Sequence, residues 1–494
     1  MESVKKNFIY NIIYQILVII LPLITAPYIA RTLGAEAVGI YSYTNSIAYY
    51  FLMIAMLGIS NYGNRSVAAS RDDKKSLNTV FSSIYLLQVC TFSIAILSYI
   101  IYIVFFAKSN KLIAFIQLLY VISGLFDISW LFFGLEKFKI TVSRNIIIKI
   151  LTILCMFVFV HKPEDLWLYT LIMSMGTLLS QIYLWFYVKK EVELVKVPLQ
   201  SVVGIIKPIL ILFIPVLAYS IYKVMDKIML GNMSTYTQVG FYQNAEKIIN
   251  IPMGVITALG TVMLPRMSNI IAKGEKEKTE QYIRISIKIV TILCSAIAFG
   301  LMGIASVLAP VYLGEAFSEC SSIIMLLSIS VFFIAWANVV RTQFLIPNKY
   351  DKIYVTSTLV GAVLNFFINY ALIPRFQSDG AAIGTVVAEF SVMIFQVIAI
   401  RKELNILKYI AKYIPVICSG AVMMFLVHKI GEIMGNHILT LIVQICCGGI
   451  FFCSFTLLYL FFSKDEVFKI VAEQFKGKIG KIHFIAKSDI TKRK

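Results

Sequence analysis

The chain has 494 residues, of which 59% are hydrophobic and 14% are charged, and its net charge is +19. This composition excludes an ordinary soluble domain, in which charged residues make up about a quarter of the total. A helix needs roughly 20 apolar residues to cross the hydrocarbon core of a bilayer. About fourteen segments meet this criterion, and they begin near residues 8, 39, 80, 112, 145, 166, 208, 237, 285, 320, 353, 380, 409 and 438.

The first apolar segment continues to about Ala30 without a small-residue cleavage site. A signal peptide has a shorter apolar region that ends at such a site, so we expect a permanent membrane helix.

Two prolines lie in this helix and two in the first helix after residue 200, at Pro22, Pro27, Pro208 and Pro215. Matched prolines predict helices that can bend, although proline is also common in membrane helices generally.

A repeat divides the predicted helices into two sets of six. The sequence VGIY at Val38–Tyr41 recurs 201 residues later as VGFY at Val239–Tyr242, and Arg65 recurs as Arg266. An even number of crossings gives both halves the same orientation, which predicts parallel repeats with a transport pathway between them. We therefore expect an all-α polytopic membrane protein with a six-helix lobe at 1–200, a second six-helix lobe at 201–403, two further transmembrane helices at 404–463 and a basic cytoplasmic tail at 464–494.

The basic residues predict the orientation in the membrane. When the loops are assigned alternately to the two sides, starting inside, nearly all lysines and arginines of the loops fall on the inner side. Short loops with this bias follow the positive-inside rule, so both termini are expected in the cytoplasm and nucleic-acid binding has no support. The outer loops hold only Arg31, Lys108, Lys111, Lys162, Arg375 and Lys429.

Cysteine and histidine spacing predicts no metal site. The eight cysteines are scattered, mostly within predicted helices, and the four histidines are dispersed as well. Zinc and disulfide frameworks need ligand-spaced motifs, which this arrangement lacks. We expect no cofactor and no catalytic residue.

Three motifs resemble a known transporter family. They are Ala30–Gly34 with Gly39–Ser42, then Asp127–Phe138, then Asp226–Gly231 with Val239–Tyr242. In this order they resemble the bacterial polysaccharide-export flippases, the Wzx-type members of the multidrug/oligosaccharidyl-lipid/polysaccharide superfamily. The resemblance covers residues 1–462 and implies a 6+6+2 arrangement of helices in the bacterial inner membrane. It also implies that undecaprenyl-diphosphate-linked oligosaccharides cross to the outer leaflet for capsule or O-antigen synthesis, alongside the polymerase and glycosyltransferases of the same pathway.

Such a substrate needs cations in a water-filled cavity, because its diphosphate cannot cross hydrocarbon unsolvated. Arginine suits this role because its planar group binds phosphate oxygens bidentately. The candidates by position are Arg31, Arg65, Lys223, Arg266 and Arg341. For Arg65, Arg266 and Arg341 a plain anchoring role at the headgroups is the alternative, and Lys223 can instead pair with Asp226 one turn away.

Four carboxylates lie within the predicted membrane helices: Asp127, Asp226, Glu246 and Glu389. Carboxylates at membrane depth often relay protons or sodium, so these residues are candidates for ion coupling, with the ion left open. Charge pairing that fixes helix packing is the alternative for Asp226 and Glu246. Among the aromatic residues, Tyr41, Tyr43, Tyr242 and Trp336 are candidates for stacking on sugar rings.

Two other functions compete with a flippase. A cation-coupled multidrug exporter of the same superfamily would need an acidic, aromatic cavity, whereas a diphosphate flippase needs a basic one. A polysaccharide polymerase or ligase would need a large loop with catalytic groups, and the predicted outer loops are very short. The chain also lacks the dense arginine cluster that lipid II flippases carry in their first helix, which argues against a peptidoglycan precursor as cargo.

Overall fold

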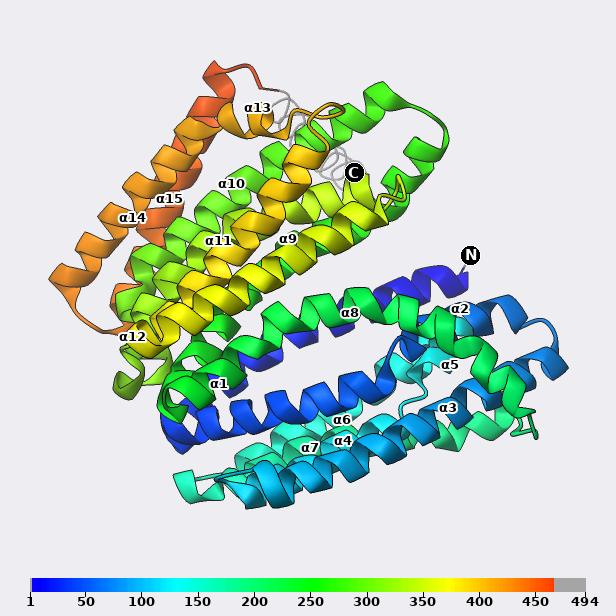
Figure 1. The fold of residues 1–494 in the computed structure, drawn as a ribbon. Helices are drawn as coiled ribbons and strands as arrows, with labels where there is room; N and C mark the ends of the chain where they lie inside the picture. Colours follow the sequence, from blue (N-terminus) through cyan, green and yellow to red (C-terminus); the bar gives the residue numbers. More distant parts are fainter. Residues whose placement is uncertain (1, 466–494) are drawn as a thin grey trace, which may run out of the picture. The chain divides into compact units, whose positions relative to one another are not determined.

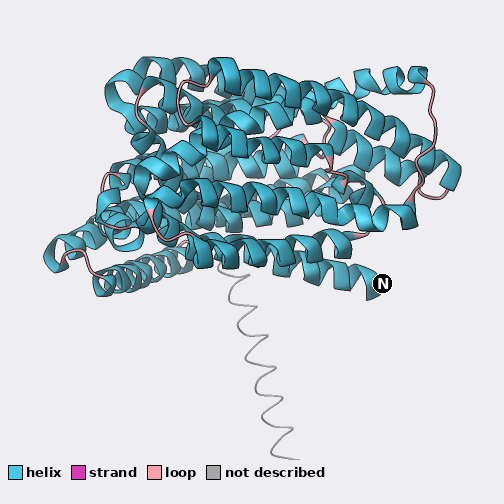
Figure 2. Cartoon of the chain, turned by 90° about the horizontal axis from the view of Figure 1, so that it is seen from below, coloured by secondary structure: helices cyan, strands magenta, loops and turns pink. Residues whose placement is uncertain are grey.

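The structure is a computed structural model that describes residues 2–465, and for residues 2–20, Tyr219 and Tyr222 it describes the backbone alone. Every regular element in this part of the chain is a helix, as Figure 1 and Figure 2 show. The α-helices are α1 (Glu2–Met56), α2 (Ile59–Ser70), α3 (Lys74–Ile101), α4 (Lys111–Leu125), α5 (Ser129–Gly134), α6 (Phe138–Phe159), α7 (Leu166–Glu191), α8 (Leu199–Met233), α9 (Tyr236–Ala272), α10 (Lys276–Leu308), α11 (Cys320–Val340), α12 (Asp351–Ala399), α13 (Ile406–Ala411), α14 (Ile414–Met434) and α15 (Ile438–Phe462).

Two of these helices contain a sharp kink. The backbone of α1 leaves the helical region at Gly34, where φ is 79°, and that of α12 does so at Gln377, where φ is 49°. Each is therefore two consecutive helices, and together with the other long helices they give about fourteen, as predicted. Where side chains are described, eleven helices are long and apolar enough to cross a membrane. The prediction of an all-α polytopic membrane protein is confirmed.

The described chain forms two compact units that interleave in sequence. Unit 1 contains the residues up to Ile251, together with Tyr312–Ile323 and Thr358–Ala388. Unit 2 contains Pro252–Val311, Ile324–Ser357 and the described residues from Glu389 onward. The division into lobes at residues 200 and 403 remains a prediction. The basic tail predicted from Lys464 lies outside the described residues after Asp465.

The core of one end of unit 1 is built around Trp130 of α5. This side chain is 1% exposed, and it packs on Phe81 of α3 and on Gly63 of α2, where a Cβ atom would collide with the indole ring. Its indole N–H donates to Gln88 Oε1 at 3.2 Å. The Gln88 amide in turn donates to the backbone carbonyls of Gly124 and Asp127, at 2.8 and 3.0 Å. These carbonyls lie where the chain leaves α4, and in a membrane such freed backbone groups must be satisfied internally.

The two copies of the repeated motif meet at one helix crossing in unit 1. A Cβ atom at Gly39 of α1 would overlap the carbonyl oxygen of Tyr236, and one at Gly240 of α9 would overlap that of Ala35. Each glycine thus lies against a residue four positions before the other glycine. Small residues at such positions allow the backbones of membrane helices to approach closely. The glycines of the repeat therefore bring α9 against the second half of α1.

Unit 2 contains the last two long helices, α14 and α15, which pack with α10 (Figure 1). Their shared core consists of apolar side chains spaced along α14 and α15, including Val416, Met423, Val427, Phe452 and Leu460. Several outward side chains of these helices are apolar and exposed, as expected for lipid-facing surfaces. The two helices added after the repeat are therefore part of a three-helix cluster with α10.

Candidate functional site

A cavity of about 670 Å³ lies within unit 1 and is lined by α1, α6, α7, α8 and α9. Its charged lining residues are four cations: Arg144 and Lys149 from α6, Lys227 from α8 and Lys247 from α9. No carboxylate is found among the described residues of this lining. The uncharged lining includes hydroxyl and amide side chains, among them Ser42, Asn45, Thr152, Thr177, Gln181 and Gln243. The cavity therefore offers positive charge together with many hydrogen-bonding groups.

Arg144 is held in a fixed orientation in this wall. Its side chain is 5% exposed. Its Nε and Nη2 donate to Asn145 Oδ1 at 3.0 and 2.8 Å, and Nη1 donates to Gln181 Oε1 at 2.9 Å. These two amides are neutral, so they orient the guanidinium without cancelling its charge. A preorganised guanidinium loses little side-chain entropy when it binds an anion.

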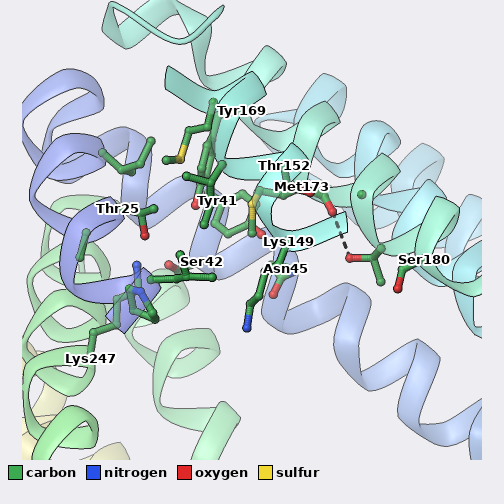
Figure 3. Close-up of a pocket in the computed structure, with 18 of the residues that line it drawn as sticks. Thr25, Tyr41, Ser42, Asn45, Lys149, Thr152, Tyr169, Met173, Ser180 and Lys247 are labelled. Atoms are coloured by element: carbon green, nitrogen blue, oxygen red, sulfur yellow. Dashed lines mark hydrogen bonds between the residues drawn. The ribbon is translucent and has the colours of Figure 1, made fainter. Parts of the chain in front are cut away.

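Lys149 and Lys247 supply two further positive charges from different helices. Figure 3 shows both side chains in the cavity wall, with Thr25, Ser42 and Asn45 of α1 in the same region. Both lysines are partly buried. Because α6 and α9 come from different halves of the sequence, the cavity is a product of the repeat as a whole.

Lys227 of α8 forms an ion pair with Glu246 of α9. Its Nζ lies 2.9 Å from Glu246 Oε2, and both side chains are largely buried, with 13% and 17% exposed. Glu246 also interacts electrostatically with Lys223 of α8. The carboxylate thus joins α9 to α8 and does not line the cavity. This geometry is that of the predicted helix-pairing alternative for Glu246.

Asp226 lies in a separate, fully buried network in unit 1. One carboxylate oxygen accepts hydrogen bonds from the hydroxyls of Tyr242 and Thr385, at 2.7 and 2.8 Å. The other oxygen accepts from Asn369 Nδ2 at 2.6 Å. These three donors are neutral side chains, and the pairing of Lys223 with Asp226 stays a prediction. Asn369 Oδ1 is itself buried without a hydrogen-bond partner among the described residues, and it occupies the space left by the missing side chain of Gly384.

Aromatic side chains of the cavity come chiefly from α1. Tyr41 and Tyr49 line it together with Tyr169 of α7, and the rings of Tyr41 and Tyr169 meet edge to face at 4.8 Å. Tyr41 thus lies where the sequence predicted a sugar-stacking residue. Tyr43, by contrast, donates to Asn232 Oδ1 at 2.8 Å beside a different hollow.

The cations predicted from sequence lie elsewhere. Arg31 of α1 and Arg65 of α2 are exposed, and neither lines the cavity. Lys223 is half-buried, and it does not line the cavity either. Arg266 and Arg341 belong to unit 2, where Arg266 lies 4.4 Å from the ring centroid of Tyr282 and also donates to its hydroxyl. The role of these five residues as substrate ligands remains a prediction.

The two remaining carboxylates have different environments. Asp127 accepts a hydrogen bond from the backbone N–H of Ser129 at 3.0 Å, so it caps the turn before α5. Glu389 is a buried residue in the last part of α12, in unit 2. Trp336, proposed for stacking, is buried in unit 2 and donates its indole N–H to Thr291 at 3.0 Å.

Sequence reasoning did not select Arg144, Lys149 or Lys247 as ligands. The signal was present: all three are charged residues inside apolar segments. A cation at membrane depth is costly and indicates function by default. Arg144 instead appeared to belong to an inner-side loop that sets topology, because the start of the fifth helix was placed at residue 145 and α6 begins at Phe138.

Comparison with known proteins identifies the family. The family model described as "Polysaccharide biosynthesis protein" matches residues 4–271. The chain belongs to this family. The family predicted from the three motifs is therefore confirmed.

Among individual proteins, the chain is 25% identical to the "Putative O-antigen transporter" of Escherichia coli (strain K12) over 81% of its own length and 97% of the relative. Among solved structures, "Lipid II flippase MurJ, inward closed conformation" aligns with a TM-score of 0.74 and 14% identity, over 93% of this chain and 99% of that chain. An inward-facing multidrug resistance MATE family transporter aligns with a TM-score of 0.57 and 16% identity, over 79% and 98%. These two likenesses concern the fold. The relatives are named as transporters or flippases, in line with the expectation of a transporter and not an enzyme.

Proposed function

We propose that this family member is a flippase for undecaprenyl-diphosphate-linked oligosaccharides. It moves the repeat units from the cytoplasmic to the outer leaflet of the bacterial inner membrane for surface polysaccharide synthesis. Both termini face the cytoplasm, and the substrate comes from glycosyltransferases and passes to a polymerase of the same pathway. The observation that carries the proposal is the cavity of unit 1, whose charged lining residues are four cations.

The chemistry of the cavity matches a sugar diphosphate. Charge-assisted hydrogen bonds from Lys or Arg to phosphate are about twice as strong as neutral ones. Arg144, Lys149 and Lys247 contribute three such donors around one space. Hydroxyl and amide groups of α1, α6 and α7 are suited to the hydroxyls of an oligosaccharide, and the ring of Tyr41 to a sugar face. The positive lining replaces part of the hydration that the diphosphate loses in the membrane.

The same lining disfavours the rival function. An exporter of organic cations would bring positive charge into a wall that already holds four cations. The fold alone does not decide between the two, because both the lipid II flippase and the MATE transporter share it. The sign of the charge in the cavity favours the flippase.

The flippase proposal is tested with purified protein in vesicles that carry a fluorescent lipid-linked oligosaccharide. Wild-type protein should expose the inner-leaflet label to an external quencher, and Lys149→Gln/Lys247→Gln should slow this exposure at least tenfold. The matched control, Lys108→Gln/Lys162→Gln, removes two exposed cations that do not line the cavity and should behave as wild type. If wild type and empty vesicles expose the label at equal rates, the flippase proposal fails. If Lys149→Gln/Lys247→Gln exposes the label at the wild-type rate, the cavity is not the site.

We further propose that Asp226 is the coupling carboxylate of this transporter. The buried carboxylate of Asp226 accepts hydrogen bonds from the hydroxyls of Tyr242 and Thr385 and from the amide of Asn369, whose Oδ1 lacks a hydrogen-bond partner among the described residues. A carboxylate buried at membrane depth suits the relay of a proton or a sodium ion. Glu246, which pairs with Lys227, has the helix-pairing role instead.

Paired substitutions separate these two roles. Asp226→Asn should abolish the dependence of transport on a sodium or proton gradient while the protein remains folded, because an amide keeps the size of the side chain. Glu246→Gln should lower thermal stability but keep the gradient dependence. Varying sodium at constant pH, and pH at constant sodium, identifies the ion. Unchanged gradient dependence in Asp226→Asn would remove Asp226 from the coupling role.

A further inference from the structure

A second hollow, of about 700 Å³, lies in unit 2 and has no part in the function described above. It is formed by the first part of α10, the segment from Arg401 through α13 to Lys412, and the end of the described chain after α15. Its lining contains seven lysines and arginines but only three carboxylates: Glu280, Glu403 and Asp465. The wall thus carries an excess of four positive charges.

Each carboxylate already has a hydrogen-bonding partner. Asp465 is 3% exposed and lies 3.2 Å from Lys288 Nζ, a buried ion pair that ties the end of α15 to α10. Glu280 accepts from the hydroxyl of Tyr409 at 2.6 Å. Burial raises the pKa of Tyr409 to about 12, so this hydroxyl stays protonated and continues to donate at neutral pH. Glu403 accepts from the hydroxyl of Tyr350 at 3.2 Å, so each carboxylate of the lining already has a donor within the protein.

The cations of the connection before and within α13 are open to a ligand. Arg401, Lys402 and Lys408 are exposed residues that line the hollow. Lysine and arginine grouped in a concave site bind phosphate well, since arginine donates two parallel hydrogen bonds and lysine adds point charge. The shared chemistry of a fitting ligand is thus a phosphate group.

The surroundings of the hollow favour a phosphate that is attached to a lipid. Large apolar side chains with high exposure lie next to its basic residues in sequence: Leu407 is 51% exposed, Ile414 52% and Phe462 77%. From there, α14 and α15 continue with exposed apolar side chains over their length. Basic pockets at the cytoplasmic ends of membrane helices bind anionic headgroups, while the acyl chains lie on the adjacent apolar surface.

We propose that the hollow formed by α10, α13 and the end of α15 binds the phosphate headgroup of an anionic phospholipid. The acyl chains of this lipid lie along the outward faces of α14 and α15. The two helices that follow the repeat thus have a lipid-binding role, separate from the substrate cavity of unit 1. If these residues only anchored the protein at the headgroups, lipid binding would not depend on whether a cation lines the hollow.

The test measures binding of short-chain phosphatidylglycerol to the purified full-length protein in neutral detergent. Arg401→Gln/Lys402→Gln/Lys408→Gln should bind on the order of 100-fold more weakly than wild type, since each basic residue contributes about fivefold near an anionic headgroup. Lys273→Gln/Lys276→Gln/Lys352→Gln is the matched control. It removes three exposed cations of unit 2 on the same predicted side, none of which lines the hollow, and it should bind as wild type.

Three further arms identify the ligand and the place. Phosphatidylcholine should bind at least tenfold more weakly than phosphatidylglycerol, and inorganic phosphate should not displace the lipid at equal concentration. If inorganic phosphate binds as tightly, the ligand is a free anion and the lipid proposal is overturned. If both triple variants lose binding equally, the effect is general surface charge. If Lys149→Gln/Lys247→Gln loses the binding, the lipid occupies the cavity of unit 1, and the proposal is likewise overturned.

Discussion

The helix crossing made by the repeated glycines allows a sharp test of how the sequence repeat acts. In Gly240→Ala the new Cβ atom would overlap the carbonyl oxygen of Ala35. In Gly39→Ala it would overlap the carbonyl oxygen of Tyr236. An ordinary contact between carbon and carbonyl oxygen is about 3.3–3.6 Å. Both obstacles are backbone atoms, so no side chain can rotate to make room. The two helices must move apart along this crossing.

The expected cost follows from that movement. Overpacking a well-packed site usually costs about 1–3 kcal/mol, and a backbone obstacle places these substitutions at the upper end. Each single variant should therefore lose about 2–3 kcal/mol in the free energy of unfolding, measured by denaturation in mixed detergent micelles. Because one separation of the helices relieves both overlaps, the double variant should lose much less than the sum of the single losses.

The matched control is Gly204→Ala on α8, where a Cβ atom would meet nothing within 4 Å. Alanine is preferred to glycine inside a helix by about 1 kcal/mol, so this variant should be as stable as wild type or more stable. If Gly39→Ala and Gly240→Ala are as stable as the wild-type protein, the close approach of the helices is refuted. Full additivity in the double variant would show that the two glycines act at independent places.

Three other contacts are tested by substitution with the same unfolding measurement. Trp130→Phe removes the indole N–H that donates to Gln88, and it should cost about 1 kcal/mol in addition to the loss of buried ring area. If this variant is as stable as wild type, the hydrogen bond does not contribute to stability. Lys288→Met and Asp465→Asn each remove one charge of a buried ion pair and should each cost about 3–5 kcal/mol, and the double variant should recover part of that loss. Tyr28→Phe removes a 2.6 Å hydrogen bond to a backbone carbonyl after α6 and should cost about 1 kcal/mol, with no effect on the unfolding of unit 2.

Much of the fold follows from the sequence because membrane helices are determined by local composition. Each long helix begins within about ten residues of its predicted start, including the two halves of α1 and of α12. The short helices α2, α5 and α13 were not predicted, since they are too short to produce an apolar segment of membrane length. The boundaries between the two compact units fall within α9 and α12. Hydropathy gives no means of locating such boundaries.

The site was harder to predict because it depends on which helices are neighbours. Asp226 and Glu246 were predicted as coupling or helix-pairing carboxylates, but the side chains that contact them could not be read from spacing. Asn369 and Thr385, which bond to Asp226, are more than 140 residues away in the chain. Only the packing of α12 beside α8 brings these groups together.

The repeat and the cavity are connected through this packing. The close approach at Gly39 and Gly240 sets the position of α9 against α1, and Lys247 lies only two turns farther along α9 from that contact. Lys227 is linked to the same helix through Glu246. A substitution that separates α1 from α9 should therefore also displace the cations that α8 and α9 contribute to the cavity. The repeated motif contributes no cation to the cavity, and it holds the second half of the sequence where its lysines complete a positively charged wall begun by α6.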